Sequence, residues 1–265
     1  MAKIGFIGMG NMGSAIMKGL LSVYAPEDMI FTAAHREKME LVTSQTGVGH
    51  AASNRQCAEQ VKYLILAVKP QYFDVVFGEI REVLTPDQVI VSLAPGISIE
   101  NIRTRLGGKV RVVRAMPNTP ALLGEGMTGV TYEAGIYTEE ERQEISLIFS
   151  SCGRMELVEE RLMDAVGCVS GSSPAFVYMF IEALADSGVK YGLPRKTAYA
   201  MAAQTVLGSA KMVLETGKHP GQLKDEVCSP GGTTIAGVSA LEEFGLRNAV
   251  IKAADACYDK TQRMK

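Results

Sequence analysis

Residues 229–234, Ser-Pro-Gly-Gly-Thr-Thr, combine a glycine-rich turn with hydroxyl side chains at a point where a helix is expected to begin. Backbone N–H groups at such a turn, and in the first turn of a helix, bind anions such as a carboxylate. A hydroxyl group in the same place can hydrogen-bond the bound molecule or relay a proton to it. The residues also make a good N-capped helix preceded by a turn, so on their own they leave both interpretations open.

A second segment with chemical potential is Ile4-Gly-Phe-Ile-Gly8-Met-Gly10-Asn-Met-Gly13, which places G-x-G-x-x-G directly after a predicted strand. A helix is expected to follow it and to run to about Tyr24. In dinucleotide sites the three glycines permit a tight turn, a close approach to the pyrophosphate and close packing of helix on strand. The helix N-terminus adds N–H donors and a positive dipole. The context therefore indicates a dinucleotide site rather than a simple glycine-rich turn, and the expected contacts are Ile7, Gly8, Met9, Gly10, Asn11, Met12 and Gly13.

The second predicted strand ends in Ala33-Ala34-His35-Arg36, without the acidic residue that commonly binds the ribose hydroxyls of NAD. A guanidinium group suits the 2′-phosphate of NADPH. We therefore expect NADPH as the cofactor, with NADH as the alternative and with His35 and Arg36 at the phosphate. The solvated start of a helix explains the same residues equally well.

Two more segments, Ala67-Val-Lys-Pro70 and Ser92-Leu-Ala-Pro-Gly96, follow the third and fourth predicted strands. Open α/β sheets bind their ligands at the carboxyl ends of the strands, so these segments are expected to face the nicotinamide. A lysine at a strand end is more often a cofactor or loop contact than a catalytic acid. The expected contacts are Ala67, Val68, Lys69, Pro70 and Ala94.

Asn118 lies between two prolines in Met116-Pro-Asn-Thr-Pro120, just beyond the fifth predicted strand. Its amide is a candidate substrate contact at the edge of the active cleft. It is equally suited to cap a turn.

The elements that position these residues fall into two halves. Up to residue 158, short apolar runs alternate with longer amphipathic stretches, which predicts an α/β domain with a parallel sheet and helices on both faces. Thr138 and Glu141 form a capping box for one helix, and Gly153 is interpreted as its stop. The expected strands are 3–7, 29–33, 63–67, 88–93, 110–114, 127–132 and 154–158.

Residues 159–265 lack strand signals and consist of long Ala-, Met- and Leu-rich stretches separated by glycines. We therefore expect an α/β domain over 1–158 and an all-α domain over 159–265. The helical half carries more apolar surface than so few residues can bury, and a homodimer formed through it would cover that surface.

Composition excludes several classes of protein. The 27 basic and 29 acidic residues give a net charge of −2 without long single-sign blocks, so a nucleic-acid partner has no support. The apolar stretch from Pro174 to Tyr191 carries Glu182, Asp186 and Lys190, which argues against a membrane span. The glycines of the N-terminal apolar run argue against a signal peptide.

The five cysteines are odd in number and widely spaced, so we interpret them as reduced thiols of a cytoplasmic protein. The three histidines leave little material for a metal site or a Ser-His-Asp triad, and no bound metal is expected. These residues are Cys57, Cys152, Cys168, Cys228, Cys257, His35, His50 and His219.

Residues 223–235, Leu-Lys-Asp-Glu-Val-Cys-Ser-Pro-Gly-Gly-Thr-Thr-Ile, closely resemble the signature of the pyrroline-5-carboxylate reductase family. Four other segments resemble family segments in the family's order, so the resemblance covers essentially the whole chain. One departure is Ser173, where the family usually has glycine. The four segments are Ala67-Val-Lys-Pro70, Arg114-Ala-Met-Pro-Asn-Thr-Pro120, Gly171-Ser-Ser-Pro174 and His219-Pro-Gly221.

The resemblance implies a Rossmann-type N-terminal domain and a helical C-terminal domain that pairs with its twin, often in a ring of dimers such as a homodecamer. It implies reduction of Δ1-pyrroline-5-carboxylate to L-proline with hydride from NADPH. By motif position Asn54 would contact the cofactor, and Thr234 takes the place of the family's proposed proton donor. The residues implied to hold the substrate are Ser229, Gly231, Gly232, Thr233 and Thr234.

Two alternative functions fit parts of the sequence. A β-hydroxyacid dehydrogenase would also join a Rossmann domain to a helical one, but it relies on a catalytic lysine in the helical half. Lys190 and Lys211 are the candidates, and neither stands in a recognisable motif. The other alternative is a regulator that binds NADPH without turnover, against which the intact Thr234 argues.

Overall fold

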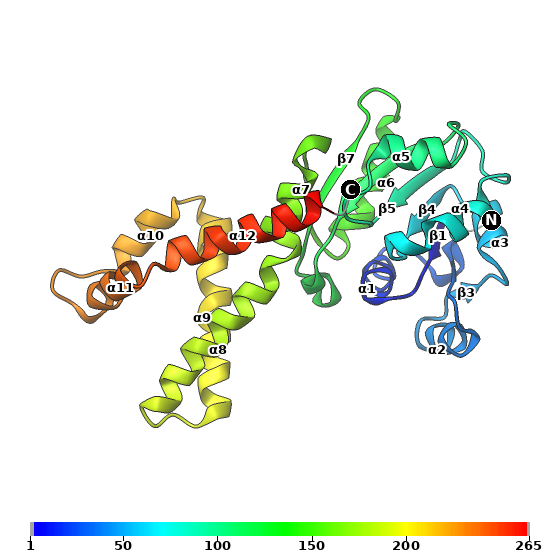
Figure 1. The fold of residues 1–265 in the computed structure, drawn as a ribbon. Coiled ribbons are helices and arrows are strands. Elements are labelled where there is room, and N and C mark those ends of the chain that lie inside the picture. Colours follow the sequence, from blue (N-terminus) through cyan, green and yellow to red (C-terminus); the bar gives the residue numbers. More distant parts are fainter. Residues whose placement is uncertain (1–2, 264–265) are drawn as a thin grey trace. The chain divides into compact units, whose positions relative to one another are not determined.

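The computed structural model describes residues 3–263, which form two compact units. The first unit contains residues 3–172 together with residues 257–263, and the second contains residues 173–256 (Figure 1). The chain therefore passes from one unit to the other twice, after Ser172 and after Ala256.

The first unit is built around a sheet of eight strands in the order β3-β2-β1-β4-β5-β6-β7-β8. The strands are β1 (Ile4–Ile7), β2 (Met29–Thr32), β3 (Gly49–His50), β4 (Tyr63–Leu66), β5 (Val89–Ser92), β6 (Arg111–Met116), β7 (Gly126–Tyr132) and β8 (Gly153–Leu157). The expected parallel sheet is confirmed from β3 through to β6, but β6 and β7 are antiparallel. Only a short 3-10 turn, Thr119–Leu123, connects these two strands, whereas a parallel crossover needs about a dozen residues or more.

The register of the parallel strands places their carboxyl ends level with one another. Ile7 of β1 pairs with Thr32 of β2 and with Leu66 of β4, and Leu66 pairs in turn with Ser92 of β5. The segments that follow these four residues consequently begin at one edge of the sheet, which is where ligands bind in open α/β folds.

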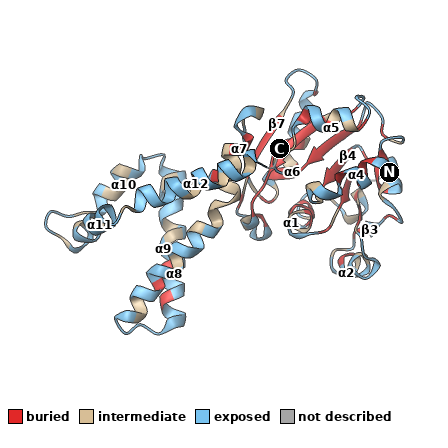
Figure 2. Ribbon diagram, in the orientation of Figure 1, coloured by how far each residue is buried: buried red, intermediate tan, exposed pale blue. Residues whose placement is uncertain are grey.

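Alternate residues of each central strand enter two different cores, which explains why the strands appear as continuous apolar runs. Ile4 and Phe6 pack with α1 (Asn11–Leu20) and α6 (Glu139–Ser150), on one face of the sheet. Leu64 and Leu66 pack on the other face. That face is covered by α3 (Asn54–Glu59), α4 (Phe73–Ile80) and α5 (Ile99–Arg105), and the buried strands stand out in Figure 2.

The seven strands expected from the sequence are present, with ends that differ by one or two residues, and β3 is an eighth. The capping box at Thr138 and Glu141 is confirmed at the start of α6. The role expected for Gly153 is wrong. Helix α6 ends earlier, at Ser150, and Gly153 opens β8 so close to its partner that a Cβ would lie 2.0 Å from the Gly126 carbonyl oxygen. Helix α1 likewise ends at Leu20, before the expected Tyr24.

The segment that leaves β8 stays with the first unit. Helix α7 (Met163–Val166) packs on β7, and Asp164 Oδ1 accepts a hydrogen bond from Arg114 Nη2 of β6 at 3.3 Å. Gln262 Nε2, near the end of the chain, donates to Asp164 Oδ2 at 2.8 Å. These contacts place the division between the compact units later in the chain than the sequence boundary between residues 158 and 159.

The described part of the second unit is entirely helices and turns, as expected after residue 159. Its helices are α8 (Ser173–Lys190), α9 (Arg195–Thr216), α10 (Pro220–Val227), α11 (Thr233–Glu243) and the greater part of α12 (Leu246–Gln262). Its own buried core is small and consists of Ala185, Ala198 and Ala202. Much of α8 and α9 is coloured as exposed in Figure 2. The large apolar side chains that remain exposed along these helices include Tyr178, Met179, Met201 and Leu214.

Within residues 3–263, one helical run, Glu160–Lys190, is long and apolar enough to cross a membrane by length and composition alone. An 18-residue window within this run has a mean hydropathy of 1.3, and 11% of that window is buried. A π-helix, Gly167–Gly171, interrupts the run. Exposed apolar helices of this kind are also typical of subunit interfaces.

Candidate active site

The turn between β1 and α1 has the backbone geometry of a pyrophosphate cradle. Gly8 has a φ of +100°, and a Cβ on Gly13 would lie 2.4 Å from the Gly8 carbonyl oxygen. Gly10 has open space around its Cα, caps α1 without a side-chain hydrogen bond, and leaves the first N–H groups of the helix without a side-chain cap. No acidic residue lies in the first turn to repel an anion. The glycines therefore fit a bound dinucleotide.

The predicted cofactor residues around this turn contribute in different ways. The side chains of Ile7 and Met9 are buried in the core, so these residues can offer only backbone groups to a ligand. Ala94, after β5, is buried as well. Asn11 is exposed at the start of α1, and Met12 is partly buried against the core.

The segment after β2 brings a positive charge to the same edge of the sheet. His35 caps α2 (Arg36–Thr46) with extended backbone, and Arg36 is the first helical residue. The Arg36 side chain is 85% exposed and its Nε lies 2.9 Å from Glu40 Oε1. An exposed i,i+4 ion pair of this kind contributes little, so it does not prevent Arg36 from binding a phosphate.

Strand β3, which the sequence did not predict, lies beside β2. It pairs with β2, and the segment after it reaches α3, where Ser53 Oγ accepts from the Gln56 N–H at 3.1 Å. The next residue, Asn54, donates from Nδ2 to Glu79 Oε2 of α4 at 2.6 Å. The spacing Ser-x-x-Gln is a helix-start signal and could have located this segment.

The segment after β4 lies directly beside the glycine turn, because a Cβ on Gly8 would come within 2.8 Å of the Ala67 carbonyl oxygen and of Val68 Cγ1. Lys69 is exposed and caps a 3-10 turn that begins at Pro70. The structure thus brings the predicted cofactor segments after β1, β2, β4 and β5 to one edge of the sheet.

In the second unit, residues 229–234 form a tight turn that opens α11 (Figure 1). Gly231 has a φ of +67°, and the Gly232 N–H donates to the Ser229 carbonyl at 3.0 Å. A Cβ on Gly232 would lie 2.4 Å from Ser229 Oγ. Thr233 and Thr234 are the first two helical residues and both are exposed. The turn therefore presents helix N–H groups and hydroxyls together, as the anion-site interpretation requires.

Asn118 has both ends of its amide engaged inside the first unit. Nδ2 donates to the Ser170 carbonyl at 3.0 Å, and Oδ1 accepts from the Met127 N–H at 2.9 Å. Of the two roles expected from the sequence, these contacts favour the structural one. Sequence reasoning also missed Arg114, a buried arginine whose only signal is its position at the end of an apolar strand.

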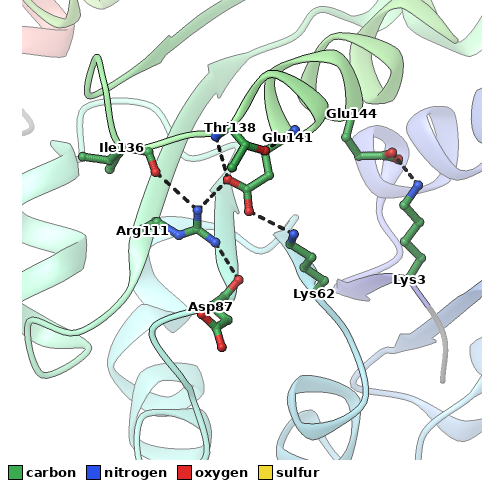
Figure 3. Close-up of polar contacts among 8 residues, drawn as sticks. All are labelled: Lys3, Lys62, Asp87, Arg111, Ile136, Thr138, Glu141 and Glu144. Carbon is green, nitrogen blue, oxygen red and sulfur yellow. Dashed lines mark hydrogen bonds and ion pairs between the residues drawn. The ribbon is translucent and has the colours of Figure 1, made fainter.

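At the amino ends of the strands, opposite the cofactor segments, lies a cluster of charged residues (Figure 3). Glu141 Oε2 lies 2.6 Å from Arg111 Nη1, and Glu141 Oε1 lies 2.9 Å from Lys62 Nζ. The hydrogen bond from Arg111, opposed in part by burial, lowers the pKa of Glu141 to about 2. Lys62 and Arg111 lie at the amino ends of β4 and β6, so this cluster is far from the cofactor segments. Its ion pairs stabilise the fold.

Among residues 3–263, no group of three or more His, Cys, Asp and Glu side chains is arranged to hold a metal ion. The cofactor and substrate segments likewise contain no such group. The predicted site residues supply backbone N–H donors and hydroxyls, together with the guanidinium of Arg36 and the side chains of His35, Asn54 and Lys69.

Two family models match the chain. The model described as pyrroline-5-carboxylate reductase dimerisation matches residues 160–264, and the model described as NADP oxidoreductase, coenzyme F420-dependent, matches residues 3–96. The first covers the helical unit and the second covers the predicted cofactor segments.

The chain is also similar to curated proteins along its full length. It is 46% identical to a pyrroline-5-carboxylate reductase of Escherichia coli over 99% of this chain and 98% of that one. It is 40% identical to a protein of the same name from Arabidopsis thaliana over 98% of this chain and 96% of that one.

Solved structures show the same similarity. A pyrroline-5-carboxylate reductase from Coxiella burnetii is 34% identical with a TM-score of 0.92, over 100% of this chain and 98% of that one. A pyrroline carboxylate reductase from Plasmodium falciparum, solved with NADP bound, is 32% identical with a TM-score of 0.88, over 99% and 98% of the two chains.

Proposed function

The chain belongs to the pyrroline-5-carboxylate reductase family, and on that premise we propose which residues bind the cofactor, which bind the substrate and which handle the proton. The protein is an NAD(P)H-dependent oxidoreductase that reduces the C=N bond of Δ1-pyrroline-5-carboxylate to give L-proline, a step of proline biosynthesis. The observation that carries the residue assignment is the turn at residues 229–234, which presents an anion-binding helix start and two hydroxyls inside the region of the matched dimerisation model.

The cofactor is NADPH, and we assign its pyrophosphate to the N–H groups after Gly8 at the start of α1. The 2′-phosphate falls to His35 and Arg36, because they follow β2 at the same edge of the sheet. We assign Asn54 to the cofactor as well, since it begins α3 in the segment that follows β3, the strand paired with β2. The remaining contacts come from the segments after β4 and β5, namely Ala67, Val68, Lys69, Pro70 and Ala94.

The substrate brings a carboxylate and a ring C=N bond. In the proposed arrangement the N–H groups of Thr233 and Thr234 hold the carboxylate, as a helix N-terminus does for other anions, while the Gly232 N–H closes the turn on the Ser229 carbonyl. Ser229 and Gly231 shape the turn that exposes those groups. No arginine is needed for this recognition.

Reduction requires a hydride at the imine carbon and a proton at the nitrogen, and the reduced nicotinamide supplies the hydride. We assign the nitrogen to the Thr234 hydroxyl, which is exposed at the start of α11. A threonine hydroxyl is a weak acid, so its role is to hydrogen-bond the nitrogen and pass to it a proton that water supplies to the exposed hydroxyl. The chain otherwise orients the two reactants, which is a large part of the catalysis.

The chain associates with itself through the helical region that the dimerisation model matches. The exposed apolar side chains of α8 and α9 are the surface that a second copy would cover. We propose further that the dimers assemble into a ring and that the protein works in the cytoplasm. The cysteines support the second point, because all five are free thiols and three of them are buried.

The residue assignment is tested with Thr234→Ala and Thr234→Ser, both assayed for turnover of Δ1-pyrroline-5-carboxylate and for NADPH affinity. Loss of turnover in the first variant, recovery in the second and equal NADPH affinity in both would support it. Full turnover in Thr234→Ala would show that the hydroxyl has no part in the reaction.

A further inference from the structure

The carbonyl of Ser170 lies where a helix changes its hydrogen-bonding pattern. It belongs to the π-helix Gly167–Gly171, which leads into α8. In an α-helix this carbonyl would accept from the N–H four residues further on. That residue is Pro174, which has no N–H to donate.

Asn118 supplies a donor in its place. Its Nδ2 lies 3.0 Å from the Ser170 carbonyl oxygen, and its Oδ1 accepts from the Met127 N–H of β7 at 2.9 Å. The residue is 9% exposed. A single amide therefore joins three segments of the first unit, namely the turn after β6, the start of β7 and the π-helix.

Strand β6 makes further contacts with the π-helix and with α7, the helix before it. Arg114 Nη2 lies 3.3 Å from Asp164 Oδ1 of α7, and both side chains are buried. The Met116 side chain lies beside Gly167 and Gly171, since a Cβ on either glycine would be 3.8 Å from it. Strand β6 and the turn after it thus fix the last part of the first unit before the chain enters α8.

We infer that Asn118 is a positioning residue for the reduction, and that it acts through the Ser170 carbonyl rather than by touching the substrate. The chain leaves the first unit after Ser172 and goes on to the helices that carry the substrate turn, so Asn118 holds a carbonyl just before that exit. Asn118 and Pro174 form a matched pair in this account, because the proline removes the helical donor and the asparagine replaces it. The inference rests on the proposed function, because turnover is its main readout.

The test is a rescue experiment with Asn118→Ala, Pro174→Ala and the double variant. We expect Asn118→Ala to lower kcat/KM for Δ1-pyrroline-5-carboxylate by about tenfold, since small misplacements of reacting groups cost at least this much. Its affinity for NADPH and its oligomeric mass should stay unchanged. In the double variant residue 174 regains an N–H for the Ser170 carbonyl, so most of the lost activity should return.

A substrate ligand would behave differently, because a new N–H at residue 174 could not replace a lost contact with the substrate. Reduced activity without rescue, or full activity in Asn118→Ala, would therefore overturn the inference. Hydrogen exchange of residues 167–176 gives a readout that does not depend on turnover, and it should rise in Asn118→Ala and fall again in the double variant. If Asn118→Ala does not fold, Asn118→Asp serves instead, since it keeps an acceptor for Met127 and places an acceptor in place of the donor against the Ser170 carbonyl.

Discussion

Replacing Glu141 by glutamine tests how much the charged cluster at the amino edge of the sheet stabilises the fold. The Glu141 side chain is 6% exposed and binds Arg111, Lys62 and the Thr138 N–H (Figure 3). The hydrogen bond from Arg111 is the largest cause of its lowered pKa of about 2, against an ordinary value of 4.5. A carboxyl whose pKa is lower in the folded chain than in the unfolded chain stabilises the folded state at pH values above its ordinary pKa.

The shift sets the size and the pH range of the effect. A difference of about 2.5 pKa units corresponds to about 3 kcal/mol, which is fully present near neutral pH and is lost as the pH falls from about 5 towards 2. Glu141→Gln keeps an acceptor for the Thr138 N–H but leaves Arg111 and Lys62 without their carboxylate. We therefore expect the variant to lose about 3 kcal/mol near neutral pH, and much less at about pH 3.

Urea unfolding of the two proteins across this pH range measures the difference directly. The matched control is Glu140→Gln, one position away on the same helix turn but exposed, which should change stability far less than Glu141→Gln does. Equal stability of Glu141→Gln and the parent near neutral pH, or the same pH slope in both, would refute the reasoning.

Three further substitutions test the site. Thr234→Ala should lower turnover about a hundredfold because the imine nitrogen loses its hydroxyl partner, with NADPH affinity from fluorescence titration unchanged; a similar loss of NADPH affinity would contradict the role. Arg36→Ala should raise KM for NADPH about tenfold and leave KM for NADH unchanged, since only the 2′-phosphate contact is removed. Equal changes for both cofactors in initial-rate assays would rule that contact out. Gly13→Ala places a methyl group 2.4 Å from the Gly8 carbonyl oxygen, so it should lower Tm and cofactor affinity. The control Gly78→Ala meets nothing within 4 Å and lies inside α4, so it should leave cofactor affinity unchanged and raise Tm slightly. Normal cofactor titration of Gly13→Ala would show that the turn tolerates the group.

Much of the first unit could be predicted from its sequence because the signals are local. Strands such as β4 and β5 are buried on both faces and therefore appear as short apolar runs between turns. The capping box at Thr138 predicts the helix that follows it, and two glycines predict the turn before α11. In each case the residues that define the element are neighbours in the chain.

The features that escaped prediction depend on partners distant in the sequence. Strand β3 has only two residues, both exposed, and forms because β2 offers its edge. The reversed direction of β7 follows from the short turn before it, which apolar runs do not show. Asn118 looked equally like a substrate contact and a turn cap, because the Ser170 carbonyl that it binds lies 52 residues away.

The sequence locates the expected cofactor segments more fully than the expected substrate turn. The segments after β1, β2, β4 and β5 each follow a recognisable strand, and parallel register brings them together. The substrate turn lies in the helical unit, where no sheet edge collects the residues, and its assignment drew on the resemblance of residues 223–235 to a known family.

The measurement that tests the central claim most directly follows the loss of nicotinamide absorbance when the purified protein is mixed with Δ1-pyrroline-5-carboxylate, with NADPH and NADH in parallel and proline quantified as product. We predict saturable turnover, proline formed in equal amount to the cofactor oxidised, and a preference for NADPH. Binding of NADPH without turnover, or oxidation without proline, would contradict the account.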